Sequence, residues 1–337
     1  MLGYHPHKPG RPSHTYHTYL MANLRRVLEV EVQDGHQTAS NHSAPGLWAL
    51  LSRLPREHWP VLIRGDKDWG TESNMARAEQ QGLHYLFKLR LTKNVKRLLE
   101  RLMRGNDWVN TGQGWQGADA EVRISGWSHA RRVVVLRRPV KRSLAVADQS
   151  QPKQLKLSFT ELADHVTVYE YAVLVTSLKH ERVTLAQLYR DRADGENSFD
   201  ELKNHWGWGG LTTHDLKRCR FMARTTALID NWWSLFVRLV KPDQPTEALT
   251  SRLLMLYALG KQTQHAGQTH LTISSTHAEA DSVEAAFRRI AQFFKTLSAT
   301  AEHLNTVQRW CRILSLALVK YLHGRQLQPP AWLPAPG

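Results

Sequence analysis

Four side chains with complementary chemistry follow one another at helical spacing in the second half of the chain. They are the phenol of Tyr189, the guanidinium of Arg192, the carboxylate of Glu196 and the ammonium of Lys203. Their spacing predicts one stripe along an α-helix. Such a stripe suits a site that binds a metal ion through the carboxylate and grips phosphates through the cations. The alternative is a solvated helix face whose charges pair with their i,i+3 and i,i+4 neighbours.

The spacing is also specific. Read without a gap, Tyr-x2-Arg-x3-Glu-x6-Lys resembles the signature of one branch of bacterial DDE insertion-sequence transposases. The resemblance implies that Glu196 is the third member of an Asp-Asp-Glu triad that binds Mg²⁺ or Mn²⁺. It also implies that Tyr189, Arg192 and Lys203 contact the DNA backbone and its terminal phosphate.

A second carboxylate, Asp66, follows a short predicted strand. The apolar run that begins at Trp59 ends in Arg64, Gly65 and Asp66. Ligands of open α/β sheets gather at the carboxyl ends of strands, where Asp66 is expected to lie. This segment resembles the one that carries the second aspartate of the triad. Asp68 is a competing ligand, and a helix N-cap or turn residue is the non-catalytic alternative.

Three carboxylates are the working minimum for the implied chemistry. Two divalent ions about 3.5–4 Å apart stabilise the attacking and leaving oxygens of a phosphodiester, and carboxylates suit Mg²⁺. The resemblance places the first aspartate on a strand upstream of the segment that begins at Gly3. We therefore expect a truncated and defective copy. Glu29 and Glu31 alternate with apolar residues and are expected on the solvent face of a strand, so they are poor substitutes.

The charge balance favours a polyanionic partner. Lys and Arg outnumber Asp and Glu by 45 to 30, which gives a net charge of +15 and a pI near 10.0. This balance suits double-stranded DNA and predicts salt-sensitive binding. The sequence shows no secretory signal, basic amphipathic anchor or apolar stretch long enough to cross a bilayer, so we expect a cytoplasmic, nucleoid-associated protein.

The pattern of expected elements predicts an α/β fold. With the resemblance, the expectation is an RNase H-like mixed sheet with flanking helices, a β-rich insertion and a helical C-terminal region. The expected parts are residues 1–103 as a partial catalytic core without its first strand, 104–176 as the insertion, 177–240 as core helices with the signature, and 241–337 as a helical region and tail. Within them, residues 216–240 are expected to form a helix whose aromatic stripe packs on the sheet, and 260–282 a linker.

The expected insertion supplies further candidate DNA contacts. Asp66 and Glu196 are 130 residues apart, and the resembling branch fills this gap with β structure. In relatives a tryptophan of this insertion stacks on a flipped base, a role open to Trp115 or Trp127. The alternative is that both anchor a small β layer. Arg131 and Arg132 are the candidate DNA-facing cations, with a solvated basic loop as their alternative.

Together these features predict a DDE transposase that cleaves and joins DNA at insertion-sequence ends, with Asp66 and Glu196 as metal ligands and a homodimer in the synaptic complex. The alternative is a non-catalytic DNA-binding remnant of a transposase.

Overall fold

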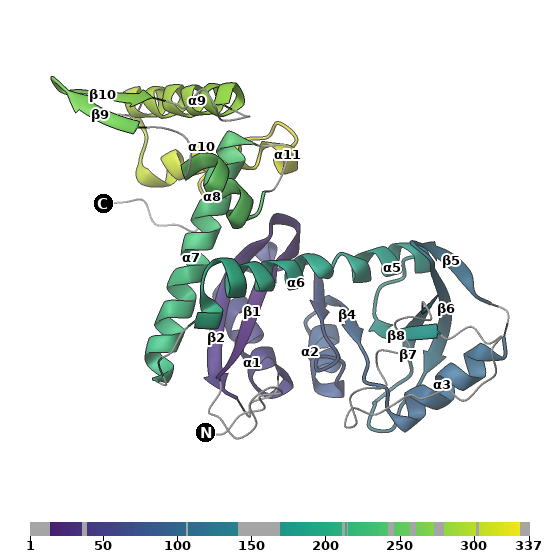
Figure 1. Ribbon diagram of the computed structural model, residues 1–337. Coiled ribbons are helices and arrows are strands. Elements are labelled where there is room, and N and C mark those ends of the chain that lie inside the picture. Colours follow the sequence, from purple (N-terminus) through teal and green to yellow (C-terminus); the bar gives the residue numbers. More distant parts are fainter. Residues whose placement is uncertain are drawn as a thin grey trace. The chain divides into compact units, whose positions relative to one another are not determined.

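The chain forms two compact units, Met1–Glu196 and Asn197–Gly337. The computed structural model describes residues 14–35, 39–105, 107–140, 169–210, 213, 215–241, 246–256, 261–272, 280–300 and 303–330. Figure 1 shows strands and helices together in the first unit, and a mainly helical second unit that runs from green to yellow.

A mixed sheet of six described strands organises the first unit. Its order is β3-β4-β8-β7-β6-β5; β3 and β4 are parallel and the other neighbours are antiparallel. The strands are β3 (Leu62–Gly65), β4 (His84–Lys88), β5 (Val109–Gly112), β6 (Trp115–Val122), β7 (Arg131–Pro139) and β8 (Tyr169–Thr176). The helices are α1 (Ala39–Leu51), α2 (Glu72–Gln80), α3 (Lys93–Met103) and α5 (Arg182–Arg190), and α6 (Ala193–Asp200) contains the boundary between the two units.

Helices cover both faces of this sheet, which explains why its central strands are apolar throughout. Side chains alternate between the faces, so Val133 and Val135 join the cluster that contains α2 and α3 residues. Val134 and Leu136 point the other way and pack with Leu185 of α5. Figure 1 shows α5 running beside the sheet strands. A sheet buried on both faces gives continuous apolar runs in place of an alternating pattern.

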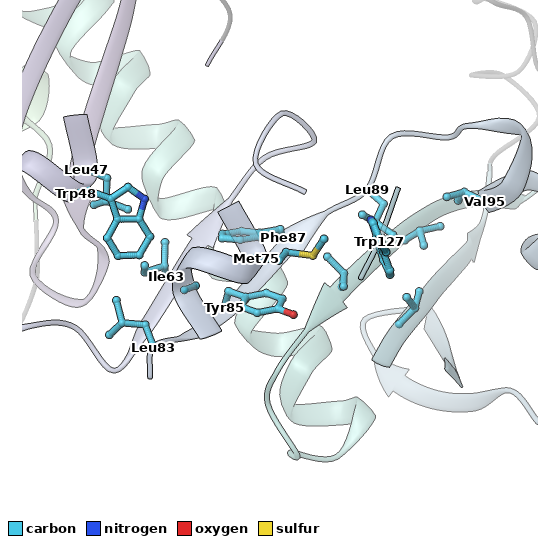
Figure 2. Close-up of a cluster of buried hydrophobic side chains, with 14 of the residues drawn as sticks. Leu47, Trp48, Ile63, Met75, Leu83, Tyr85, Phe87, Leu89, Val95 and Trp127 are labelled. Carbon is cyan, nitrogen blue, oxygen red and sulfur yellow. The ribbon is translucent and has the colours of Figure 1, made fainter. Parts of the chain in front are cut away.

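The larger cluster joins α1, the sheet and α3 into one core. Figure 2 shows its aromatic centre, where the rings of Tyr85 and Phe87 stack with centroids 5.1 Å apart and Met75 of α2 lies beside them. Leu89 and Trp127 continue the same cluster toward α3. The buried face of α3 consists of Val95, Leu98 and Leu99. The predicted fold class is confirmed, because this mixed α/β arrangement with a helical C-terminal region is consistent with an RNase H-like fold.

The predicted division at residues 103 and 176 stays a prediction. Strands from both sides of residue 103 share the one sheet, since β4 pairs with β8 and β8 with β7.

A buried ion network fastens β7 to α2. The Arg131 side chain is 2% exposed. Its Nη1 donates to Glu72 Oε2 at 2.6 Å and its Nε to Glu79 Oε1 at 2.7 Å. The Tyr85 hydroxyl donates to the same Glu79 oxygen at 2.7 Å, and Ser128 Oγ donates to Glu72. Arg131 donates hydrogen bonds to both carboxylates, Tyr85 adds one to Glu79, and Ser128 adds one to Glu72. A buried charge such as that of Arg131 is tolerated when it is paired in this way.

This network predicts acid-sensitive stability. Hydrogen bonding from Arg131, with a smaller contribution from Ser128, lowers the pKa of Glu72 from 4.5 to about 2. A carboxylate whose pKa is depressed by folding stabilises the protein above the unfolded pKa, and that contribution is lost as the pH falls. We expect the melting temperature to fall between pH 4.5 and pH 2, with a shallower fall in Glu72→Gln. Thermal melts across this window test it; equal slopes for both proteins would contradict the assignment.

A separate hairpin of β1 (His14–Met21) and β2 (Arg26–Asp34) packs with α1. Glu29 and Glu31 share one face of β2, as predicted, but the expectation that this face is exposed to solvent is wrong. A Cβ at Gly46 of α1 would collide with the Glu31 carboxylate and the Tyr19 hydroxyl, so α1 lies over this face. The Tyr19 hydroxyl donates to the Ser43 carbonyl at 2.8 Å. Both glutamates are half-buried because a helix packs where the alternation indicated water.

The second unit is built mainly from helices. They are α7 (Leu216–Val240), α8 (Ala248–Leu256), α9 (Ala280–Ala299), α10 (Thr306–Ala317) and α11 (Val319–Leu322). The C-terminal half of α7 packs against α8 and α9 through Val237, Met255 and Ile290. Trp233 Nε1 of α7 donates to Ser251 Oγ of α8 at 2.8 Å. No helix among the described residues is long and apolar enough to span a membrane.

Two expectations for this unit are wrong. Part of the predicted linker forms a hairpin of β9 (Lys261–His265) and β10 (Gln268–Thr272). Its two turn residues, Ala266 and Gly267, have positive φ, as a two-residue hairpin turn requires. The β9 side chains are all exposed, so its sequence carries no alternation of buried and exposed residues from which a strand could be predicted. The aromatic stripe of α7 is only partly core, because Phe221 is 67% and Trp232 55% exposed.

Candidate active site

Asp66 opens the turn that follows β3. Its Oδ1 accepts a hydrogen bond from the Lys67 backbone N–H at 2.6 Å, and its carbonyl accepts one from the Trp69 N–H at 2.8 Å. Gly65 is required before it, because a Cβ there would collide with the Trp69 ring. Parallel pairing of Gly65 with Phe87 brings the carboxyl end of β4 to the same edge of the sheet. Asp66 is exposed, so its carboxylate is accessible at the position predicted from sequence.

Three of the four signature residues lie together at the junction of α5 and α6. Arg192 Nη2 donates to Glu196 Oε1 at 2.7 Å, and the Arg192 guanidinium lies 5.8 Å from the centroid of the Tyr189 ring. The Glu196 side chain is 62% exposed. This carboxylate is therefore paired with Arg192 and open to solvent.

The predicted single helical stripe is wrong in detail. Helix α5 ends at Arg190, a turn occupies Asp191 and Arg192, and α6 is followed by a π-helical turn, Glu201–His205, that carries Lys203. Asp and Gly are weak helix formers, so the segment does not sustain one unbroken ladder. Backbone hydrogen bonds from Arg192 to Tyr189 and from Glu196 to Arg192 still keep these three residues on neighbouring turns. Lys203 is exposed and belongs to the second unit.

One arginine connects the strand of Asp66 to the helix of Tyr189. Arg64 Nη1 donates to the Leu188 carbonyl at 2.7 Å, across 124 residues of sequence. Leu62, on the same face of β3, packs in the cluster that includes Leu188 and Tyr189. The two segments that carry the candidate carboxylates are thus fastened together. No role for Arg64 follows from the sequence alone; the signal that could have found it is a charged residue within an apolar strand.

We expect Arg64→Met to lower the free energy of unfolding of the first unit by about 1.5–3 kcal/mol, because the Leu188 carbonyl loses a charged donor. Arg53→Met is the control, since the Arg53 side chain is 62% exposed and its pairing with Glu29 is long, at 3.6 Å. Its expected loss is under about 1 kcal/mol. Urea unfolding followed by tryptophan fluorescence measures both. Similar losses in the two variants would show that the link contributes nothing specific.

Trp127 and Arg131, two predicted DNA contacts, lie inside the first unit. Trp127 is 8% exposed and belongs to the core cluster. The Arg131 guanidinium lies 5.5 Å from the centroid of the Trp127 ring and is bonded to Glu72 and Glu79. Burial favours the alternative role of a structural anchor for both side chains. Contact of either residue with DNA stays a prediction.

Arg132 and Trp115 are less buried. Arg132 Nε donates to Asp119 Oδ1 at 2.8 Å, and its Nη1 donates to the Leu178 and His180 carbonyls at 2.9 and 2.7 Å. These bonds hold the loop before α5 against β7. Trp115 is half-buried against the α5 face of the sheet. Their roles in DNA contact also stay predictions, although the Arg132 donors are already well occupied.

The candidate ligands, two carboxylates, are of the chemical type that binds a hard cation, but they are fewer than the proposed chemistry uses. Carboxylate oxygens such as those of Asp66 and Glu196 are the ligands that Mg²⁺ prefers. Among the described residues, however, no three His, Cys, Asp or Glu side chains gather as a metal site. Two candidate carboxylates are fewer than the three that the two-ion chemistry uses.

Comparison with known proteins identifies the family. The family model described as Transposase DDE domain matches residues 3–232. No curated protein matches the chain. The matched range covers more than half of the sequence and contains both candidate carboxylates and the whole signature segment. The chain therefore belongs to the family of transposases with a DDE domain.

Proposed function

We propose that the chain is a DDE transposase of the branch with the Tyr-x2-Arg-x3-Glu-x6-Lys signature, acting at the ends of an insertion sequence. In the proposed reaction, water attacks the phosphodiester at each element end and releases a 3′-hydroxyl. That hydroxyl then attacks a phosphodiester of the target DNA, which joins the element to its new site. The family is one of polynucleotidyl transferases that typically use a divalent metal.

The observation that carries the proposal is the contact between Arg64 and the Leu188 carbonyl. It fastens the strand that leads to Asp66 against the helix that leads to Glu196. This contact supports the proposal that Asp66 and Glu196, which are far apart in sequence, act in one site. Asp66 follows the carboxyl end of β3, and ligands of α/β sheets bind at that edge.

Each residue has a definite proposed role. Asp66 and Glu196 offer carboxylate oxygens to Mg²⁺ or Mn²⁺, which when bound stabilises negative charge on the attacking and leaving oxygens. Tyr189 donates its hydroxyl, and Arg192 its guanidinium, to oxygens of the scissile strand. Lys203 contacts a DNA phosphate as a point charge.

We further propose that the chain alone is catalytically impaired, because Asp66 and Glu196 provide one carboxylate fewer than two ions use. Its partners are the element ends and target DNA as duplexes, with a second copy in a homodimeric synaptic complex. The proposed location is the bacterial cytoplasm, in association with the nucleoid. The alternative function is a non-catalytic DNA-binding remnant that uses the basic surface alone.

The test compares two proteins on a supercoiled plasmid that carries both ends of the chain's own element. One is the chain as it stands; the other includes any in-frame extension encoded upstream of Met1. We expect Mn²⁺-dependent nicking at the element ends, faster with an extension that supplies an aspartate. DNA binding without nicking by either protein would favour the remnant and contradict the transposase activity.

A further inference from the structure

A basic cavity lies next to the turn that carries Asp66. Its volume is about 680 Å³. It lies where β4 ends, against β8, with one residue contributed by the first turns of α3. Its lining consists of Lys67, Asp68, Lys88, Leu89, Arg90, Leu91, Lys96, Tyr171 and Val173.

The charges in this lining are strongly unbalanced. Four cations face one carboxylate, Asp68, which pairs with Arg90 through Nε at 3.1 Å. Among the described residues, no carboxylate lies within 4 Å of the side-chain nitrogen of Lys67, Lys88 or Lys96. Cations that line one cavity raise its positive potential, so three lysines without a carboxylate partner favour an anionic ligand.

The rest of the lining defines the shape of that ligand. The half-buried Tyr171 and the exposed Leu91 form an apolar wall, which rests on the buried Leu89 and Val173. A free inorganic anion would leave this wall uncovered. A sugar-phosphate strand carries negative charge for the lysines and apolar sugar faces for the wall, so it matches both parts.

The position relates the cavity to the proposed chemistry. Lys67 and Asp68 line the cavity and directly follow Asp66 in the turn after β3, so the cavity adjoins the turn that carries the candidate carboxylate. The first turn of α3, capped by Thr92 where its hydroxyl accepts from the Val95 N–H, adds a positive helix end on the same side.

We propose that this cavity binds the phosphodiester backbone of the DNA strand next to the scissile phosphate, through Lys67, Lys88 and Lys96. The inference rests on the proposed function for the choice of strand, but the binding itself needs neither metal nor cleavage. The Arg90–Asp68 pair keeps one wall of the cavity ordered, and the three lysines supply the attraction.

The experiment measures salt-dependent binding of a fluorescein-labelled oligodeoxythymidylate by anisotropy, without a divalent metal. For Lys88→Gln/Lys96→Gln we expect at least about tenfold weaker binding at low salt. The slope of log K against log salt should fall by about 1.4, the value for two lost single-strand phosphate contacts. Arginine at both positions should restore most of the affinity and the slope, which separates charge from fold.

The control removes two cations from the same helix. Lys93 and Arg97 are exposed on α3 and do not line the cavity. Lys93→Gln/Arg97→Gln should change the slope by less than about 0.5. Equal losses in the two double variants would overturn the proposal, because binding would then reflect general charge. Displacement of the oligonucleotide by micromolar thymidine monophosphate would also overturn it, in favour of a free nucleotide site.

The outcome is separable from that of the proposed function. Loss of binding on Lys88→Gln/Lys96→Gln, with no DNA cleavage by either the chain or the extended protein, would keep this site and contradict the transposase activity. Glu196-dependent cleavage that is unaffected by the same two substitutions would support the transposase activity and contradict the cavity as a DNA-binding site.

Discussion

Glu196→Ala is expected to lower the metal-dependent cleavage of element-end DNA by at least about a hundredfold, measured in whichever protein nicks, the chain as it stands or the extended one. Replacing a residue that merely orients a metal ligand already costs 10–100-fold in affinity or activity, and the direct ligand should cost more. DNA affinity measured without metal should not fall, because Glu196 carries no positive charge and its removal frees Arg192 for a phosphate. Plasmid nicking and anisotropy measure the two quantities.

Metal affinity gives a readout that does not depend on turnover. Mn²⁺ binding, followed by electron paramagnetic resonance, should weaken at least about tenfold in both Glu196→Ala and Asp66→Ala. Glu181→Ala is the matched control, because Glu181 is an exposed glutamate at the start of α5 whose side chain makes no capping hydrogen bond. Full cleavage by Glu196→Ala would show that the catalytic acid lies elsewhere.

Arg131→Met should produce the largest loss of stability, about 2–4 kcal/mol. Water reaches the Glu72 and Glu79 side chains, which are each 28% exposed, and this limits the loss. The substitution leaves Glu72 and Glu79 without the guanidinium that both carboxylates accept from, in a site where Arg131 is 2% exposed. Chemical unfolding of the variant and wild type measures the loss. A loss below about 1 kcal/mol would show that the network is no stronger than a surface ion pair.

Two companion variants identify the cause. Arg138→Met removes an arginine of the same strand whose side chain is 50% exposed, and it should cost under about 1 kcal/mol. Adding Glu72→Gln and Glu79→Gln to Arg131→Met should recover part of the stability, because the unpaired charges are then gone. No recovery would assign the loss to packing against Trp127 instead.

Much of the fold could be predicted from local patterns. The expected helix over residues 216–240 has those bounds in the structure, because Asp215 caps its start through the Arg218 N–H and the chain leaves the helix after Val240. The strand before Asp66 also lies where the apolar run and the turn residues indicated. These features depend on neighbours within a few residues, and such dependence is visible in sequence.

The partners of charged residues could not be predicted in the same way. Arg131 belongs to a basic stretch of the sequence, and its burial follows from Glu72 and Glu79, 59 and 52 residues away. Arg64 likewise finds its acceptor 124 residues away. Composition identifies a cation but not the carboxylate or carbonyl that folding brings to it. The candidate site was therefore predicted through its exposed carboxylates, and its supporting contacts were missed.

The ion pair between Arg192 and Glu196 has a thermodynamic consequence. If a metal ion binds Glu196, it competes with Arg192 for the same carboxylate oxygen and releases the guanidinium. A DNA phosphate that engages Arg192 releases Glu196 in the same way. Each ligand therefore breaks the Arg192–Glu196 ion pair that the other would otherwise have to break. Metal and DNA should accordingly bind with positive cooperativity. Linkage requires the two effects to be equal, and a single coupling free energy describes both.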